Sequence, residues 1–121
     1  MDAELEFTTQ DLGGCIIARL AGEIDISNAE RLQTLLSSTI GEGNLVIDLS
    51  RVTFMDSTGL SAMIVAYRRG QGTHHTLRLA CAQGAVRRVL EITQLDIVLE
   101  HHDDLGDAVE AALSELNGAP S

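Results

Sequence analysis

The sequence alternates short apolar runs with stretches of helical periodicity, and this alternation constrains the fold more than any other feature. Apolar runs predict strands at 15–22, 44–50, 76–81 and 96–100, and apolar residues three and four apart predict helices at 27–40, 60–69, 85–92 and 103–116. Strands that alternate with helices are joined by crossovers and pair in parallel. Residues 5–8 form an expected edge strand, which the Gly13-Gly14 turn joins to 15–22 as a hairpin. We therefore predict an α/β fold with one mixed sheet.

Local signals set the expected ends of these elements. Ser27 and Glu30 have the spacing of a capping box at the start of the first helix. Gly22 is expected to end the second strand, and Gly70 is expected to end the second helix.

The length and net charge of the chain limit the number of domains and the kinds of partner that we expect. The chain has 121 residues, the size of one domain, for which we expect a core at 5–116 and a frayed tail at 117–121. The formal net charge is −10, which argues against binding nucleic acid or an anionic membrane surface. The sequence contains neither an apolar stretch of about 20 residues nor a signal-peptide pattern, so we expect a cytoplasmic protein. The acidic surface suits a basic protein partner, or it serves only solubility.

Cysteines and histidines offer no metal or redox site. Cys15 and Cys81 lie in apolar runs, do not form a CxxC pair and are expected to be buried thiols rather than a disulfide. The histidines come as adjacent pairs at 74–75 and 101–102, without the spacing of zinc ligands. We expect no metal and no cofactor.

Residues 54–60, FMDSTGL, carry the chemistry. They lie where a strand pattern becomes a helix pattern, and Asp56, Ser57 or Thr58 should cap that helix. A nucleophile elbow would read G-x-S-x-G, whereas Met55 and Asp56 precede this serine, and no histidine is placed to serve as its base. A phosphate-binding loop would need more glycines and a lysine, so catalysis and nucleotide binding are both disfavoured.

Ser57 fits better as a residue on which another protein acts. A phosphate adds about −1.5 to −2 charges at pH 7. At a helix N-terminus it would meet free backbone N–H groups and the positive end of the helix dipole, so the fold should tolerate it. Repulsion by Asp56, and by Asp25 if it lies close, would keep the phosphate directed outward. Such a site would change the surface without unfolding the domain.

The segment VIDLSRVTFMDSTGLSAMIVAYRR at 46–69 resembles the signature of the STAS domain family, which includes anti-sigma factor antagonists and the tails of sulfate transporters. LAGEIDISNAERLQTLL at 20–36 is similar to the approach of that family to its first helix. The resemblance covers 5–116. It implies a mixed sheet of four to five strands, with about four helices packed mainly on one face.

The resemblance also implies a function without enzymatic activity. Free-standing members of the family bind an anti-sigma factor that is also a serine protein kinase, and they are switched off when this kinase phosphorylates them. A serine phosphatase reverses the modification. The implied phosphorylation site is Ser57, with Thr58 as a minor candidate, and the implied partner-binding residues are Asp25, Asp56, Ser57, Thr58 and Gly59. The alternative is a non-catalytic STAS adaptor or scaffold in a signalling or lipid-transport complex.

Two assignments stay open at this point. Asp25 either orients the Ser57 hydroxyl or caps the first helix together with Ser27. Asp48 is expected to end the third strand near the Ser57 loop, without an assigned role. The exposed sides of the first two helices are expected to join the partner surface. The oligomeric state is a monomer or a weak dimer, because the first edge strand could pair with another copy.

Overall fold

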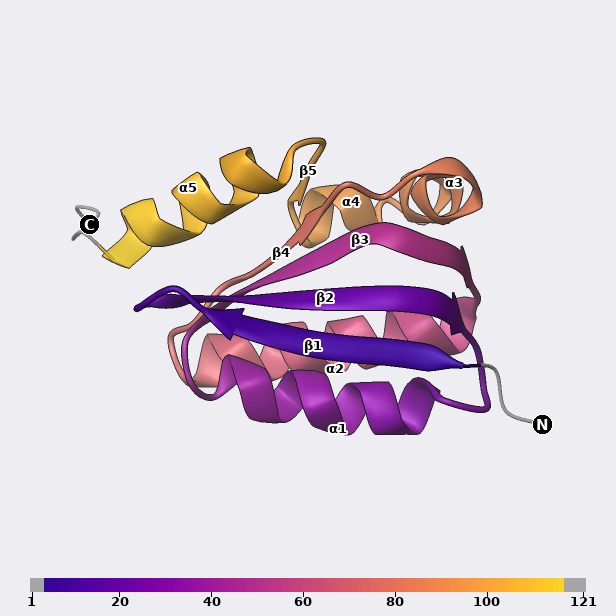
Figure 1. Ribbon diagram of the computed structural model, residues 1–121, viewed down its shortest axis with the longest axis horizontal. Coiled ribbons are helices and arrows are strands. Elements are labelled where there is room, and N and C mark those ends of the chain that lie inside the picture. Colours follow the sequence, from indigo (N-terminus) through magenta and orange to yellow (C-terminus); the bar gives the residue numbers. More distant parts are fainter. Residues whose placement is uncertain (1–3, 117–121) are drawn as a thin grey trace.

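The computed structural model describes residues 4–116, and its sheet begins with a hairpin (Figure 1). β1 (Leu5–Asp11) pairs antiparallel with β2 (Cys15–Ile24) across a turn in which Gly13 and Gly14 both have positive φ. Each later strand is parallel to its neighbour, and the sheet order is β1-β2-β3-β4-β5. The other strands are β3 (Asn44–Met55), β4 (Leu77–Ala80) and β5 (His101–His102). The predicted mixed sheet is therefore confirmed, with five strands.

Crossover helices connect the parallel strands. They are α1 (Ala29–Ile40), α2 (Ser57–Gly72), α3 (Gly84–Ile92) and the single turn α4 (Leu95–Val98), and α5 (Leu105–Leu116) follows β5. In Figure 1, α1 and α2 lie side by side below the sheet, whereas α5 lies on the opposite side.

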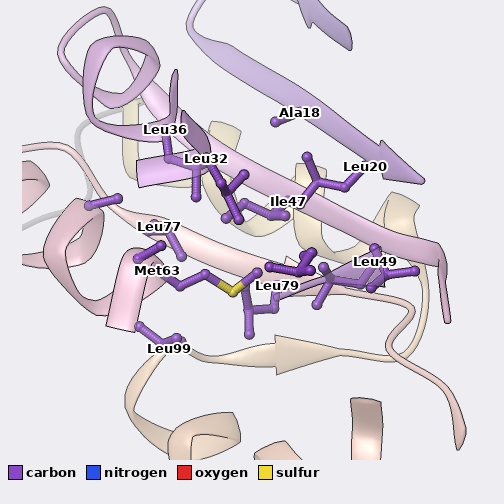
Figure 2. Packing of buried hydrophobic residues seen from close by; sticks show 14 of the residues in the cluster. Ala18, Leu20, Leu32, Leu36, Ile47, Leu49, Met63, Leu77, Leu79 and Leu99 are labelled. Carbon is purple, nitrogen blue, oxygen red and sulfur yellow. The ribbon is translucent and has the colours of Figure 1, made fainter. Parts of the chain in front are cut away.

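The core is divided by the sheet into two clusters. Leu45 and Ile47 of β3 belong to the larger cluster, which also receives apolar side chains from α1, α2 and α3. Figure 2 shows Ile47 in this cluster together with Leu32 and Leu36 of α1 and Met63 of α2. Val46 between them points to the opposite face, as alternation along a strand requires, and packs in a smaller cluster with Ala108 and Ala112 of α5. The prediction that helices pack mainly on one face is confirmed, with α5 covering part of the other face.

Several strands differ in length from their predicted bounds. β1 runs to Asp11, which pairs with Ile16 across the hairpin. β3 runs to Met55, because register shifts between β2 and β3 keep those two strands paired beyond the apolar run. Gly22 does not end β2. It lies inside the strand with φ +115°, and a Cβ there would stand 2.3 Å from the carbonyl oxygen of Glu4. The glycine therefore permits the chain before β1 to approach β2 closely.

Two predicted helix signals are wrong. α1 begins at Ala29 after Asn28, and the Ser27 hydroxyl donates to the carboxylate of Asp25 at 2.6 Å, so Ser27 and Glu30 form no capping box. α2 continues through Gly70 to Gly72. Gly70 instead packs closely against the chain before β4, since a Cβ there would stand 2.7 Å from the carbonyl oxygen of His75.

The last predicted strand, 96–100, is also wrong. Residues 95–98 form α4, and the strand comes afterwards at His101–His102. The apolar run resembles a strand in the sequence, but only Leu95 and Leu99 pack against the core, and their spacing is that of one helical turn. The predicted tail at 117–121 lies outside the described residues.

Candidate functional site

Two acidic residues directly follow the carboxyl ends of the neighbouring strands β2 and β3. Ile24, the last residue of β2, is paired with Met55, the last residue of β3. Asp25 and Asp56 are the residues that follow this pair. The Asp56 N–H donates to the Ile24 carbonyl at 3.2 Å and keeps the two strand ends together. In α/β sheets this edge is where binding residues gather.

Asp56 caps α2, which confirms the predicted cap. One carboxylate oxygen, Oδ1, accepts hydrogen bonds from the Thr58 N–H at 2.9 Å, from the Gly59 N–H at 3.4 Å and from the Thr58 hydroxyl. These donors, the Thr58 hydroxyl first, hold the pKa of Asp56 below its ordinary value. The carboxylate is therefore ionised at neutral pH and binds protons poorly.

Ser57 is the first residue of α2 and its side chain is exposed. Within residues 4–116 no hydrogen bond of its hydroxyl is found, whereas the Thr58 hydroxyl is half-buried and donates to Asp56. Of the two candidate hydroxyls, Ser57 is thus the accessible one.

The start of α2 corrects one expectation about a phosphate on Ser57. The N–H groups of Thr58 and Gly59 were expected to be free for it, but both already donate to Asp56. A phosphate would have to displace that carboxylate or remain directed into solvent, and two anions competing for the same donors favour the second arrangement.

Asp25 organises the loop between β2 and α1. Its Oδ1 accepts from the N–H of Ser27 at 2.9 Å and from the Ser27 hydroxyl at 2.6 Å. Its own N–H donates to the side-chain oxygen of Asn28 at 3.1 Å, and the Asn28 amide donates to the Glu23 carbonyl at 2.8 Å. The loop is held by side-chain hydrogen bonds beside the start of α2.

Gly59 lets α2 start close to the sheet. A Cβ at this position would stand 2.6 Å from Cγ2 of Ile24 and 2.7 Å from Cγ of Met55. The glycine therefore fixes the height of Ser57 above the strand ends by allowing close packing rather than by an unusual backbone angle.

A groove beside Ser57 adds residues that sequence reasoning missed. It has a volume of about 450 Å³ and is lined by Ile26, Ala29, Glu30, Gln33, Thr58 and Ser61. A second groove shares Gln33 and continues between α1 and α2 to Val65 and Arg69. Ile26 is 81% exposed. Its signal in the sequence is an apolar residue three positions before Ala29, where the helical pattern starts.

Asp48 does not belong to this site. β3 continues for seven residues after it, and Asp48 is a buried residue inside the strand, 4.0 Å from Nε of Arg19. The expectation that it ends the strand near Ser57 is wrong, because the polar segment after residue 50 remains paired with β2.

The described residues carry no group of three or more His, Cys, Asp or Glu side chains that could hold a metal ion. Cys15 and Cys81 are both free; Cys15 is buried as expected, but Cys81 is half-buried and leaves β4 with φ +64°. Across 4–116, none of the helices has both the length and the apolar character needed to span a membrane.

Comparison with known proteins places this geometry in a family. Residues 6–108 match the model of the STAS domain. The anti-sigma-B factor antagonist of Listeria monocytogenes is 34% identical over 83 residues, which are 67% of this chain and 73% of the relative.

Solved structures agree in fold. An anti-sigma factor antagonist from Mycobacterium paratuberculosis is 28% identical with a TM-score of 0.80, covering 90% of this chain and 94% of that one. The Bacillus antagonist SpoIIAA, solved in unphosphorylated and phosphorylated forms, has a TM-score of 0.72 in the unphosphorylated form at 21% identity, covering 96% of this chain and all of that one. The chain belongs to the STAS domain family, in which these anti-sigma factor antagonists lie.

Proposed function

We propose that this protein is an anti-sigma factor antagonist controlled by phosphorylation of Ser57. In its unphosphorylated form it binds an anti-sigma factor that is also a serine protein kinase, and the bound sigma factor is released to direct transcription in the cytoplasm. The observation that carries the proposal is the exposed Ser57 hydroxyl on the first residue of α2, beside a fixed Asp56 cap. The antagonist names of its relatives support the same assignment.

The chain would be a substrate in this reaction and not an enzyme. The Ser57 Oγ forms a bond to the γ-phosphorus of ATP, the bond from that phosphorus to the bridging oxygen breaks, and ADP leaves. The serine proton must pass to a base. Asp56 is a poor acceptor because hydrogen bonds from Thr58 and Gly59 lower its pKa. The base therefore comes from the kinase.

The phosphate would act by changing the charge of the binding surface. About two negative charges would be added beside Asp56 and next to the loop held by Asp25. A kinase surface that fits the unmodified hydroxyl would then face an unpaired dianion, which weakens binding. Because the Ser57 side chain is exposed, the fold itself need not change. A serine phosphatase would restore the binding form.

The groove between α1 and α2 extends the proposed binding surface away from Ser57. Its wall includes Thr58 and Ser61 of α2 and the exposed Ile26 in the loop before α1. We therefore assign Asp25, Asp56, Ser57, Thr58 and Gly59, together with this groove, to the contact with the kinase.

The test is to incubate the purified protein with ATP and each anti-sigma factor kinase encoded in the same genome, and to map the phosphate by mass spectrometry. One phosphate on Ser57 is expected, with none in Ser57→Ala even though Thr58 is intact. Phosphorylation that persists in Ser57→Ala would reject the site. Binding of an anti-sigma factor without phosphate transfer would instead support a non-catalytic adaptor.

A further inference from the structure

Three aliphatic side chains are exposed at the last residue of α3 and in the single turn α4 that follows it. Ile92 is 74% exposed, Ile97 is 75% exposed and Val98 is 52% exposed. We call these three residues the α3–α4 patch. They account for three of the seven large exposed apolar side chains among the described residues, within a segment of seven residues. In Figure 1, α3 and α4 adjoin each other. Such clustering marks interaction surfaces, whereas single exposed apolar residues are ordinary.

The fold does not use these side chains. In α4, Leu95 and Leu99 face the core and are joined by a backbone hydrogen bond of 2.8 Å, so Ile97 and Val98 are left outside. Gln94 and Glu100, on either side of α4, both have positive φ, 61° and 52°. Residues other than glycine adopt that region at a cost in free energy, and functional surfaces are where such a cost is retained. The chain thus holds this turn in a strained form that keeps apolar groups in water.

The surroundings of the patch are acidic. Arg88, four residues before Ile92 on α3, is an exposed cation on this side. From residue 89 to the end, however, the chain carries no Arg or Lys and eight acidic residues: Glu91, Asp96, Glu100, Asp103, Asp104, Asp107, Glu110 and Glu115. Three of these, Glu91, Asp96 and Glu100, alternate with the patch residues along the chain. Arg87 of α3 is already paired with Glu91 and Asp103. An occupant of the patch must therefore tolerate or neutralise carboxylates.

A groove next to the patch has the same character. It has a volume of about 210 Å³, and its walls include Val98, Tyr67, Glu100 and Glu115. Arg78 also lines it and is paired with both glutamates, so two carboxylates and one guanidinium leave one net negative charge on these three side chains. An apolar wall beside carboxylates suits the aliphatic stem and cationic end of a lysine or arginine side chain.

We propose that the α3–α4 patch binds a basic amphipathic helix of another protein, one with aliphatic residues along one side and Lys or Arg flanking them. A second copy of this chain would bring a second set of carboxylates, and nucleic acids and anionic membranes would be repelled in the same way. The patch does not share residues with the groove beside Ser57, so this contact is independent of the phosphorylation proposed above.

The probe is a synthetic fluorescent helix of about 15 residues with Leu at positions i, i+3, i+4 and i+7 and Lys elsewhere. We expect saturable binding in fluorescence anisotropy that weakens with added salt. Ile92→Ser with Ile97→Ser should weaken it about tenfold, because two apolar contacts are lost. Asp96→Asn should weaken it less. Ile26→Ser is the matched control, since it removes an equally exposed isoleucine from another groove, and it should leave binding unchanged.

Three results would overturn the proposal. Equal loss in Ile26→Ser and in the double variant would mean that the peptide binds without a defined site. Equal binding of a peptide with Ser in place of Leu would mean that charge alone acts. A dimer in sedimentation velocity that Ile97→Ser dissociates would assign the patch to a second copy. Circular dichroism and the melting temperature establish that each variant is folded before binding is measured.

Discussion

At the scale of single residues, Asp56 and Thr58 determine how Ser57 is presented. Asp56 caps α2, and the Thr58 hydroxyl donates to the same carboxylate oxygen. These contacts occupy Asp56 and Thr58 and leave the hydroxyl of Ser57 exposed. The adjacent hydroxyls thus differ in role: one supports the cap, and the other is accessible.

Thr58→Val tests this division. Loss of the hydroxyl removes the largest cause of the lowered pKa of Asp56, so that pKa should rise toward its ordinary value while the backbone N–H contacts remain. An NMR titration of the Asp56 carboxyl carbon measures it, with Ser57→Ala as the control that should leave the pKa in place. An unchanged value in Thr58→Val would contradict the hydrogen bond.

His101 should make stability depend on pH. Its Nε2 accepts the Ala82 N–H at 3.0 Å, which requires a neutral ring, and burial, helped by the charge of Arg87, lowers its pKa. Asp103 at 3.9 Å, Asp96 and His102 also act on the ring, and the two carboxylates oppose the lowering. As the pH falls below 6.5, the ordinary pKa of histidine, His101 is protonated in the unfolded chain before it is protonated in the folded chain.

The contribution of His101 to the free energy of unfolding should therefore be constant above about pH 6.5 and should fall as the pH drops below that value. Urea unfolding at several pH values measures the slope. In His101→Gln, which keeps an acceptor for Ala82 without titrating, the slope between about pH 6.5 and 5 should be smaller than in the wild type. Equal slopes would remove His101 from the explanation.

At the scale of elements, close packing and buried charge position the helices on the sheet. Gly59 and Gly70 let α2 approach the strand ends and the chain before β4. On the other face, Arg78 of β4 is almost fully buried and binds Glu100 at 2.6 Å and Glu115 of α5 at 2.5 Å. The helix that carries Ser57 and the helix that covers the opposite face are thus held by different means.

Gly70→Ala and Gly72→Ala form a matched pair within α2. The new Cβ at 70 would stand 2.7 Å from the backbone oxygen of His75, whereas the one at 72 would meet nothing within 4 Å. Gly70→Ala should lower the free energy of unfolding by about 1–3 kcal/mol, and Gly72→Ala should leave it unchanged or raise it by up to about 1 kcal/mol. Urea unfolding distinguishes them; equal effects would contradict close packing at Gly70.

Glu115→Gln should loosen α5. The substitution removes one of the two anions paired with the buried Arg78, and because Glu115 is itself half-exposed the cost should be about 1 kcal/mol. Hydrogen exchange of α5 amides should speed up. Glu110→Gln on the same helix is the control, since Glu110 forms no ion pair with any described residue. Unchanged exchange in Glu115→Gln would show that apolar packing alone holds α5.

At the scale of the whole molecule, the sequence predicts the sheet and the site better than the element ends. Alternating patterns identify the parallel strands because a buried strand and an amphipathic helix need different apolar spacing, and Asp56 is predicted as a candidate cap by its local chemistry. Gly22 and Gly70 were misread as ends because their reason is contact with distant segments. The run at 96–100 was misread because an apolar strand and a turn with an exposed apolar side look alike in sequence.

The groove beside Ser57 could not be predicted for the same reason. Ile26 lies in the loop before α1 and Ser61 lies in α2, and they line one groove only after α1 and α2 pack together. Likewise, the hydrogen bonds that tie Asp25 to Ser27 depend on the exact loop conformation between β2 and α1.

The central claim is that charge on Ser57 switches partner binding on an unchanged fold. The most direct measurement compares the affinity of the wild type and Ser57→Asp for the anti-sigma factor kinase that phosphorylates it, by calorimetry, alongside NMR spectra of both proteins. We predict binding at least about tenfold weaker for Ser57→Asp, with spectral changes confined to the start of α2 and the loop before α1. Equal affinity, or a spectrum in which the fold has been lost, would contradict the account.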